Sequence, residues 1–195
     1  MRYWPVKKSF SKDVPEPGEQ GSFWENRGDR FHCGVDIYAP ATSEVVAIEG
    51  GKVIGVGVHT SPYFKKYWNR TLYLLVRSDT GIIYKYAELG RLDINMNQTV
   101  VAGQQIGRLG NVLKPEMIGE DSPGYIQNLK DLPSMLHLEI YESDPIEKHE
   151  HYLGGNWFRS KKPANLLDPT QLLKELTPEE RSILNESMPQ EVSSP

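Results

Sequence analysis

The sequence predicts a mostly β protein built on an antiparallel sheet, followed by short helices near the C-terminus. Short runs rich in Val, Ile and Tyr alternate with turn residues through the middle of the chain. Gly (17) and Pro (14) are frequent enough for many turns without reaching the level of a disordered chain. After Leu166 helix-start signals replace this pattern. At 195 residues, the chain is long enough to bury a core as one domain with a tail.

The N-terminal segment differs in composition from the rest of the chain. Residues 9–30 are polar and rich in Gly, Pro and Glu. Such a composition is typical of an irregular segment, so we expect it to wrap the core without forming strands. The predicted division of the chain is a leader over residues 1–30, a β domain over 31–173, and a C-terminal helix and tail over 174–195.

Six strands are expected in the β domain, each bounded by turn residues. They are Glu44 to Ile48, Lys52 to Val58, Arg70 to Arg77, Ile82 to Leu89, Gln104 to Leu109, and Met135 to Glu142. Between the third and fourth strands, Asp79-Thr80-Gly81 favours a hairpin, because a glycine such as Gly81 is able to take the positive φ that such turns require. Consecutive strands joined in this way predict antiparallel pairing.

Two long insertions interrupt the strands, at residues 59–69 and 111–134. Loops of this length in a compact domain often shape a functional site. One interpretation is that the second insertion lies across a groove as a lid.

Helix signals appear at the C-terminal end. Asp168 and Pro169 are the expected N-cap and first residue of a helix that continues over 170–176. Residues 177–180 resemble a capping box that opens a second helix.

Composition excludes several classes of function. The 22 basic and 26 acidic residues give a net charge of −4 and a pI of about 5.8, which argues against nucleic acid as a partner. A mean hydropathy of −0.52 and the lack of an apolar run near 18 residues predict no membrane span. The single cysteine, Cys33, permits neither an internal disulfide nor a cysteine-based zinc cluster.

The N-terminus lacks the apolar stretch and cleavage site of a secretory signal. The sequence as written therefore predicts a cytoplasmic protein. Phage delivery, or trimming of a secreted protein, would give the same N-terminus. The default expectation for the oligomeric state is a monomer.

The first candidate for chemistry is the pair His32 and Asp36. In an ideal strand their backbones would stand about 13 Å apart, too far to share a metal ion. A helix is improbable here because Gly34, Val35 and Pro40 disfavour it. A bend at Gly34 remains, which would bring His32 back beside Asp36.

The second candidate lies in the last expected strand. Alternation places Leu136, Leu138 and Ile140 on the core face, and His137 on the opposite face with Glu139. His137 is then either a solvated, hydrogen-bonded residue or a ligand. With His32 and Asp36 it would complete a set of two histidines and one carboxylate, which favours zinc over calcium or magnesium. Glu139 is either a solvated carboxylate or a partner that orients His137.

The order of motifs resembles the lysostaphin-type zinc endopeptidases, which cut peptide cross-links of bacterial cell walls. The resemblance covers about residues 28–173 and is carried by five segments. These are His32-Cys33-Gly34-Val35-Asp36 for the family's H-x-G-x-D, Tyr86-Ala87-Glu88-Leu89 for Tyr-x-His-Leu, residues 100–107 for V-x-A-G-Q-x-I-G, Met135-Leu136-His137-Leu138-Glu139 for the closing H-x-H-x-E strand, and Leu167-Asp168-Pro169 for the exit.

The resemblance implies a duplicated-hybrid-motif β-sandwich with a groove lined by loops, and zinc held by His32, Asp36 and His137. Two histidines of the family that are not ligands are absent, since Glu88 and Met135 occupy their positions. In the family these histidines are thought to act on the attacking water and on the developing oxyanion. A glutamate is a competent general base in other zinc peptidases, so Glu88 is the expected base. Met135 offers no comparable donor, and loss of one oxyanion stabiliser costs about 10²–10³ in rate.

Two functions are consistent with this resemblance. The first is a zinc-dependent metallopeptidase-like hydrolase acting on peptidoglycan cross-links or a related peptide. The alternative is an inactive relative that keeps zinc for stability and binds peptide or glycan in the groove. The lack of a lysine in Asp79-Thr80-Gly81 argues against a lipoyl or biotinyl carrier, and Asp36 argues against a phosphotransfer protein with paired histidines.

Other residues have a functional and a structural interpretation. The cluster His149-Glu150-His151 is the first candidate to replace the missing donor, with Tyr141, Tyr125 and His59 behind it. Tyr63 to Trp68, with Lys65 and Lys66, is either a glycan platform or a loop that folds its aromatic residues onto the sheet. Cys33 is expected to be a small buried thiol.

Overall fold

The computed structural model describes residues 1–131 and 134–176, and it is mostly β, as predicted. Its strands and helices are β1 (Phe31–His32), β2 (Val35–Tyr38), β3 (Glu44–Val46), β4 (Gly51–Val58), β5 (Leu72–Ser78), β6 (Ile83–Leu92), β7 (Thr99–Val100), β8 (Gln105–Leu109), the 3-10 helix η1 (Pro115–Met117), α1 (Gly124–Asn128), β9 (Met135–Tyr141), β10 (Tyr152–Leu153), β11 (Asn156–Trp157), β12 (Leu166–Leu167) and α2 (Thr170–Glu175).

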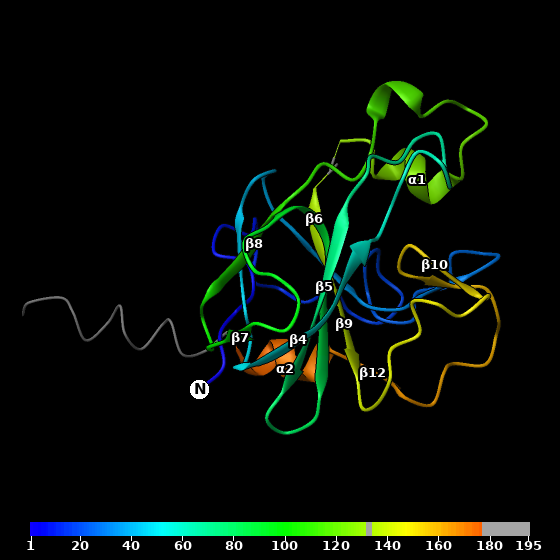
Figure 1. Cartoon of the computed structure of the whole chain (residues 1–195). Coiled ribbons are helices and arrows are strands. Elements are labelled where there is room, and N and C mark those ends of the chain that lie inside the picture. Colours follow the sequence, from blue (N-terminus) through cyan, green and yellow to red (C-terminus); the bar gives the residue numbers. More distant parts are fainter. Residues whose placement is uncertain (132–133, 177–195) are drawn as a thin grey trace, which may run out of the picture.

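One antiparallel sheet carries most of the fold. Its main path runs β12-β9-β6-β5-β4-β7, and the long strands of this path lie side by side in the middle of Figure 1. Strand β2 also pairs with β9, and β8 joins β3 to the second half of β6. A separate small sheet has the order β1-β11-β10.

The six expected strands are confirmed, with ends shifted by at most three residues. The Asp79 to Gly81 hairpin is also confirmed, and Gly81 has a φ of 89°. The four-residue strand β2 and the two-residue strands β1, β7, β10, β11 and β12 were not among the expected strands, because such short runs show little or no alternation.

The C-terminal helix is confirmed with a shift at its start. Helix α2 begins at Thr170, and Pro169, the expected first helical residue, is its N-cap. The Asp168 carboxylate still accepts a hydrogen bond from the Thr170 backbone N–H at 2.8 Å. The expected second helix at 177–180 lies outside the described residues.

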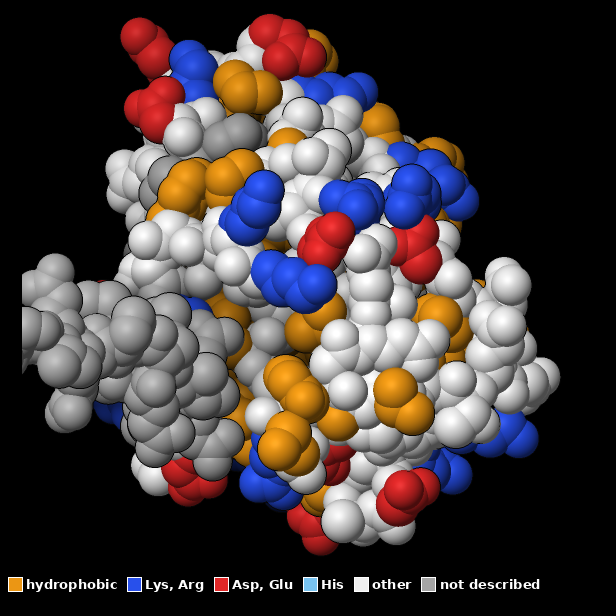
Figure 2. All heavy atoms as spheres, turned by 90° about the vertical axis from the view of Figure 1, so that its left-hand side faces the viewer, with side chains coloured by type: hydrophobic (Ala, Val, Ile, Leu, Met, Phe, Trp, Pro, Cys, Tyr) orange, Lys and Arg blue, Asp and Glu red, His pale blue; other side chains and the backbone are white. Residues whose placement is uncertain are grey.

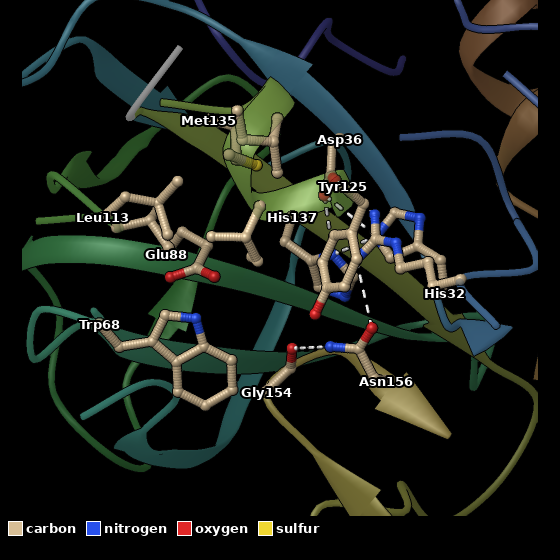
Figure 3. A pocket seen from close by; sticks show the side chains of 14 residues that line it. His32, Asp36, Trp68, Glu88, Leu113, Tyr125, Met135, His137, Gly154 and Asn156 are labelled. Carbon is tan, nitrogen blue, oxygen red and sulfur yellow. Dashed lines mark hydrogen bonds and ion pairs between the residues drawn. The ribbon is translucent and has the colours of Figure 1, made fainter. Parts of the chain in front are cut away.

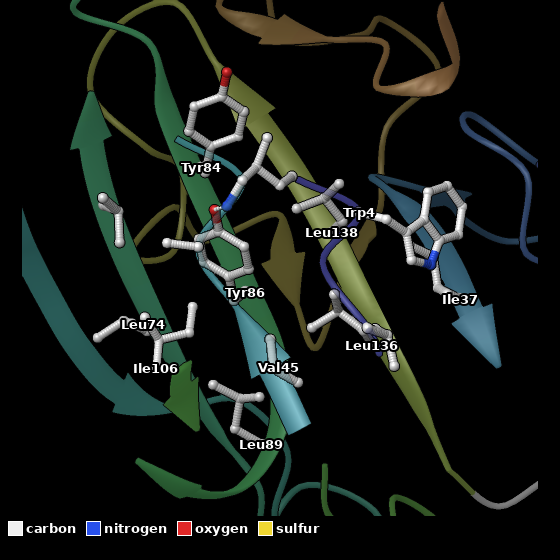
Figure 4. Packing of buried hydrophobic residues seen from close by; sticks show 14 of the residues in the cluster. Trp4, Ile37, Val45, Leu74, Tyr84, Tyr86, Leu89, Ile106, Leu136 and Leu138 are labelled. Carbon is white, nitrogen blue, oxygen red and sulfur yellow. Dashed lines mark hydrogen bonds between the residues drawn. The ribbon is translucent and has the colours of Figure 1, made fainter. Parts of the chain in front are cut away.

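The main hydrophobic core fills one side of the sheet. Val45, Leu74, Tyr86, Ile106 and Leu138 pack there, as Figure 4 shows, and none of them is exposed to solvent. Trp4, Val6 and Val14 add apolar side chains from the N-terminal segment, and Leu173 adds one from α2. Packing against this core therefore holds both ends of the described chain.

The opposite side of β9 is covered as well. This corrects the expectation that β9 has one face in the core and one face turned away from it. All seven β9 residues are buried, including His137 and Glu139. The β10–β11 turn closes over His137, because a Cβ on Gly155 would lie 2.7 Å from that imidazole. At one end of the sheet, the two insertions pack on each other around Trp68, Leu113 and Ile126.

Gly34 is the point where β1 and β2 separate, and its backbone passes close to β9. A Cβ at this position would lie 2.3 Å from the Leu138 carbonyl oxygen. Gly34→Ala must therefore push β2 away from β9. We expect it to lower the free energy of unfolding by about 1–3 kcal/mol, measured by urea unfolding. Gly124→Ala is the control, since no atom lies within 4 Å of the added Cβ. Equal stability of the two variants would contradict the expectation.

Charges of both signs mix on the surface. On the face turned toward the viewer in Figure 2, Lys and Arg side chains lie beside Asp and Glu side chains. Ion pairs such as Arg108 with Glu44 at 3.0 Å and Arg91 with Asp93 at 2.7 Å illustrate the mixing. In the described part of the chain, the helices are too short and too polar for a membrane crossing.

Candidate metal centre and the hollow around it

Three elements bring His32, Asp36 and His137 together. His32 ends β1, the bend at Gly34 turns the chain back, and Asp36 on β2 pairs in register with His137 on β9. His32 Nε2 lies 3.1 Å from Asp36 Oδ1 and 2.9 Å from His137 Nδ1, and His137 Nδ1 lies 2.9 Å from Asp36 Oδ1. All three side chains are buried. The expected bend at Gly34 is confirmed.

The far nitrogen of each imidazole has its own partner. His32 Nδ1 lies 2.8 Å from the Ser22 carbonyl oxygen, and His137 Nε2 lies 2.7 Å from Glu139 Oε1. Because both partners accept hydrogen bonds, each far nitrogen carries the proton in the neutral ring. The lone pairs of His32 Nε2 and His137 Nδ1 then point at a carboxylate oxygen of Asp36. Three acceptor atoms that converge in this way require a proton or a cation between them.

Local charges oppose the cost of burial. The Arg27 guanidinium lies 3.3 Å from the second oxygen of Asp36. Burial would lower the pKa of Arg27, but the carboxylates of Asp36 and Glu25 keep that pKa raised. Burial would raise the pKa of Asp36, but the two imidazoles hold it well below its usual range. Burial also disfavours a charged His137, yet its hydrogen bonds to Asp36 and Glu139 raise its pKa to about 9. These contacts favour positive charge at the point where the three side chains meet.

Behind His137 lies a buried ionic network. The Lys85 ammonium lies 3.4 Å from Glu139 and 3.2 Å from Glu147, and it also donates to the Tyr152 hydroxyl. Tyr152 in turn donates to Glu139 at 2.6 Å. Burial alone would raise the pKa of Glu139, but Lys85 and His137 hold it well below its usual range. An ionised Glu139 fixes the tautomer and the direction of the His137 ring.

A hollow opens beside the three side chains. It encloses about 420 Å³, including the part open to solvent, and both polar and apolar side chains line it. Both insertions contribute: Trp68 comes from the first, and Leu113, Tyr125 and Ile126 come from the second. Figure 3 shows Glu88 and Trp68 on one side and His32 with Asn156 on the other. The second insertion therefore forms a wall of the hollow.

Glu88, on β6, also lines the hollow and is held firmly in place. Its φ of 66° is strained for a residue with a side chain, and it occurs where β6 leaves β9 and pairs with β8. Oε2 accepts hydrogen bonds from Thr71 at 2.6 Å and from Thr60 at 3.4 Å. Burial outweighs these bonds and raises the pKa of Glu88 to about 7. Proton transfer near neutral pH favours such a pKa.

His59 lies beside Glu88, although the sequence ranks it only as a weak candidate. Its ring is buried and stacks on His137, with ring centroids 5.4 Å apart at an interplanar angle of 27°. Nε2 lies 3.7 Å from Glu88 Oε1. The only signal in the sequence is the position of His59 at the start of the first insertion, because nothing local links residue 59 to residue 88.

Met135 contributes packing and no donor. It is buried with Leu113, Trp68 and Ile126, and it lines the hollow. A thioether offers at most a weak acceptor to a ligand. Met135 thus brings an apolar side chain to the hollow, in line with the expectation that this position supplies no oxyanion donor.

The remaining candidates lie in different places. His149 and His151 are not among the residues that line the hollow; their rings pack on Trp157 at 4.7 and 5.9 Å. The structure therefore does not bring them to the hollow, and their role as replacement donors stays an untested expectation. Tyr125 does line the hollow, under the Arg27 guanidinium at 5.3 Å. Tyr141 is buried and donates to Glu139.

The aromatic loop divides between the two interpretations that the sequence allows. Tyr67 and Trp68 are buried with the second insertion, as the structural interpretation predicts. Tyr63 and Phe64 are exposed, with 91% and 45% of their surfaces accessible. Cys33 is a buried free thiol, as expected, and burial raises its pKa well above the usual value.

Comparison with solved structures identifies similar folds. LytU is 19% identical over 92% of this chain and 95% of its own, with a TM-score of 0.51. The catalytic domain of lysostaphin, an antimicrobial peptidase from Staphylococcus simulans, is 18% identical over 89% of this chain and 92% of that chain, with a TM-score of 0.44. At this identity the likeness to LytU shows a shared fold, which confirms the predicted architecture.

Coverage of the longer matches is lower. The chain spans 44% of an M23 peptidase candidate from Pseudomonas aeruginosa, at 22% identity and a TM-score of 0.43, and 51% of lysostaphin as solved in solution. No curated protein matches the sequence at a significant level. The sequence model of peptidase family M23 matches residues 30–146, more than half of the chain and the stretch that contains His32, Asp36, Glu88 and His137. This chain therefore belongs to peptidase family M23.

Proposed function

We propose that the protein is a zinc-dependent endopeptidase in which His32, Asp36 and His137 hold the metal and Glu88 is the general base. One observation carries the proposal: the acceptor atoms of three buried side chains from β1, β2 and β9 converge within 3.1 Å of one another. Three acceptors are a costly arrangement without a cation, so the fold maintains a site that a metal ion would stabilise.

The donor set fits zinc. Two imidazole nitrogens and one carboxylate oxygen are ligands typical of catalytic zinc, whereas calcium prefers six or more oxygens. Two ligands of a tetrahedral zinc ion stand about 3.4 Å apart, close to the 2.9–3.1 Å between these atoms. When bound, zinc would polarise a peptide carbonyl and lower the pKa of water to about 7. Glu139 and the Ser22 carbonyl would orient the two imidazoles as outer partners.

Glu88 supplies the proton chemistry. With a pKa raised to about 7, it is partly ionised at neutral pH and accepts a proton from the attacking water. It then returns that proton to the amine of the leaving peptide. The apolar wall formed by Trp68, Leu113 and Met135 limits water in the hollow, which strengthens these charge interactions.

The substrate class is inferred from the resemblance to lysostaphin-type enzymes. We propose a peptide bond of peptidoglycan cross-links, or of a related peptide. An open hollow between two insertions suits an extended peptide better than a folded protein.

One observation favours a second function, a peptide-binding or glycan-binding protein that holds zinc without catalysis. Met135 places a thioether in the hollow at a position where the family has a histidine, so one expected donor is lost. Binding of peptidoglycan without hydrolysis would support this second function.

Two measurements on the purified protein test the proposal together. Metal analysis is expected to find about one zinc ion per chain, and incubation with purified peptidoglycan is expected to release new amino groups, with loss of release after chelation and recovery with zinc. Zinc without release would leave the binding function. A chain that takes up no zinc would overturn both.

Glu139→Gln tests the outer partner of His137. Removing the negative charge weakens the orientation of His137 and leaves Lys85 with one carboxylate fewer. We expect zinc affinity to fall by about 10–100-fold, measured by competition with a chromogenic chelator. Glu142→Gln, at an exposed position next to β9, is the matched control. An unchanged affinity in Glu139→Gln would show that this contact does not act on the metal site.

A further inference from the structure

His59 has an unusual position for a histidine. It follows β4, and its backbone N–H donates to the Thr71 carbonyl at 2.9 Å, so the residue is fixed beside β5. One face of the ring packs on His137. Its side chain is 1% exposed, and on its other side it lines a second hollow together with Lys85 and Tyr152.

The Nε2 atom of His59 is buried and makes no hydrogen bond within the described part of the chain. Leaving a buried polar atom unpaired costs about 1–3 kcal/mol, so such an atom calls for a partner in the working state of the protein. The nearest candidate is Glu88 Oε1 at 3.7 Å. This separation exceeds a hydrogen bond by about half an ångström, and catalytic hydrogen bonds are often long before substrate binds.

Glu88 is prepared for this partner. Thr71 and Thr60 hold Oε2, which leaves Oε1 facing His59. A carboxylate oxygen has two lone pairs, so Oε1 can accept from one donor and still take a proton from water. The charged groups around the pair are Lys85 and Glu139 near His59, and His137 and Asp36 near Glu88.

His59 is suited to act as a neutral donor. The ring is buried against His137 and lies near the Lys85 ammonium, a surrounding that disfavours a second positive charge. A neutral imidazole carries one proton, and in the Nε2–H tautomer it donates to Glu88 without adding charge to a site that already faces cations.

We infer that His59 is a positioning residue for Glu88: its neutral imidazole donates through Nε2–H to Oε1 of the ionised carboxylate. The inference rests on the proposed role of Glu88 as general base. The family's histidine is absent at position 88, and the fold brings a histidine from the end of β4 to the glutamate that replaces it. His59 does not touch substrate in this scheme; it fixes the direction of Glu88 and favours its ionised form.

Two substitutions separate donation from packing. His59→Phe keeps an aromatic ring against His137 and removes the N–H, whereas His59→Gln removes the ring and keeps an N–H donor. Loss of the donor is expected to move the acid limb of amino-group release from peptidoglycan upward by about one pH unit. Because the pKa of Glu88 starts at about 7, this shift lowers the rate at pH 7 about fivefold, and His59→Gln is expected to keep largely normal values. A purely structural role predicts the reverse order.

A second readout is independent of turnover. Carbon-13 NMR of the zinc-loaded protein follows the Glu88 carboxyl through its titration, and nitrogen-15 NMR identifies the His59 tautomer. We expect a protonated Nε2 in the wild type and a raised Glu88 pKa in His59→Phe only. His149→Phe, a change at a ring that packs on Trp157, is the control and is expected to leave both signals unchanged.

The outcomes distinguish this inference from the proposed function. Glu88→Gln with normal turnover would overturn the role of Glu88 itself. If Glu88→Gln is inactive but His59→Phe has a wild-type pH profile and an unshifted Glu88 signal, His59 is not its positioning residue. Combining His59→Phe with Glu88→Gln is expected to add no further loss of rate, because both act on one group.

Discussion

Glu88→Gln is expected to lower the release of amino groups from peptidoglycan by about 10²–10⁴-fold while zinc content stays at about one per chain. Glutamine has nearly the shape of glutamate, and its amide oxygen still accepts the Thr71 hydrogen bond, so the fold is retained. It has no basic oxygen to take a proton from water. The loss should therefore appear in the rate and leave metal affinity unchanged.

The pH profile gives this prediction a second test. A general base works only when it is ionised, and the pKa of Glu88 is about 7. Wild-type activity should therefore rise with pH and reach half of its plateau near pH 7. The residual activity of Glu88→Gln should lack this limb. Wild-type activity in Glu88→Gln would remove the glutamate from the mechanism and leave the metal site standing.

Stability should respond in the opposite sense. The pKa of Glu88 is raised from about 4.5 in the unfolded chain to about 7 in the fold, so its contribution to stability is present below pH 4.5 and is lost as pH rises through 7. Glu88→Gln avoids this cost of about 3 kcal/mol at pH 8. We expect the free energy of unfolding of the variant to exceed that of the wild type at pH 8, with a smaller gap at pH 5, as measured by urea unfolding.

His137→Ala is expected to abolish both zinc binding and turnover. The substitution removes one of three ligands, and it also leaves Glu139 and Asp36 without the imidazole that both contact. A buried charge that loses its partner costs about 3–5 kcal/mol. Zinc per chain should fall from about one to near zero. Zinc is expected to raise the melting temperature of the wild type but not that of the variant.

Asp36→Asn provides the same test with less disturbance of the fold. The amide fills the volume of the carboxylate and keeps a side-chain contact with Arg27, but it is a poor zinc ligand. Loss of zinc from a folded Asp36→Asn chain would support the site even if His137→Ala does not fold. Full zinc content in Asp36→Asn, at a melting temperature close to that of the wild type, would contradict it. His149→Ala is the matched control.

Several parts of the fold were predictable because they depend on short-range patterns. The alternation of Leu136, Leu138 and Ile140 places one face of β9 in the core, as the structure has it. Gly81 marks a hairpin by its own backbone preference. The two-residue strands β10 and β11 were missed because they form only where the chain returns to pair with β1, which no local pattern encodes.

The candidate site was predictable to a lesser extent. The spacing of His32, Gly34 and Asp36 allowed a bend, and the family resemblance added His137. Alternation suggested an exposed His137, and this was wrong because the β10–β11 turn covers the second face of β9. The place of His59 beside Glu88 depends on the end of β4 meeting the point where β6 changes partners, so sequence distance gave no indication of it.

The sequence by itself determined the strand-rich class, the family and the residue types available for metal binding, because periodicity, turn preference and ligand chemistry are properties of the side chains. Only the tertiary structure decided which lone pairs converge and which histidine lies beside Glu88. It also decided the burial that raises the pKa of this carboxylate to about 7. Those quantities depend on distances between strands far apart in the chain and on the water that packing excludes, and both arise only when the sheet closes.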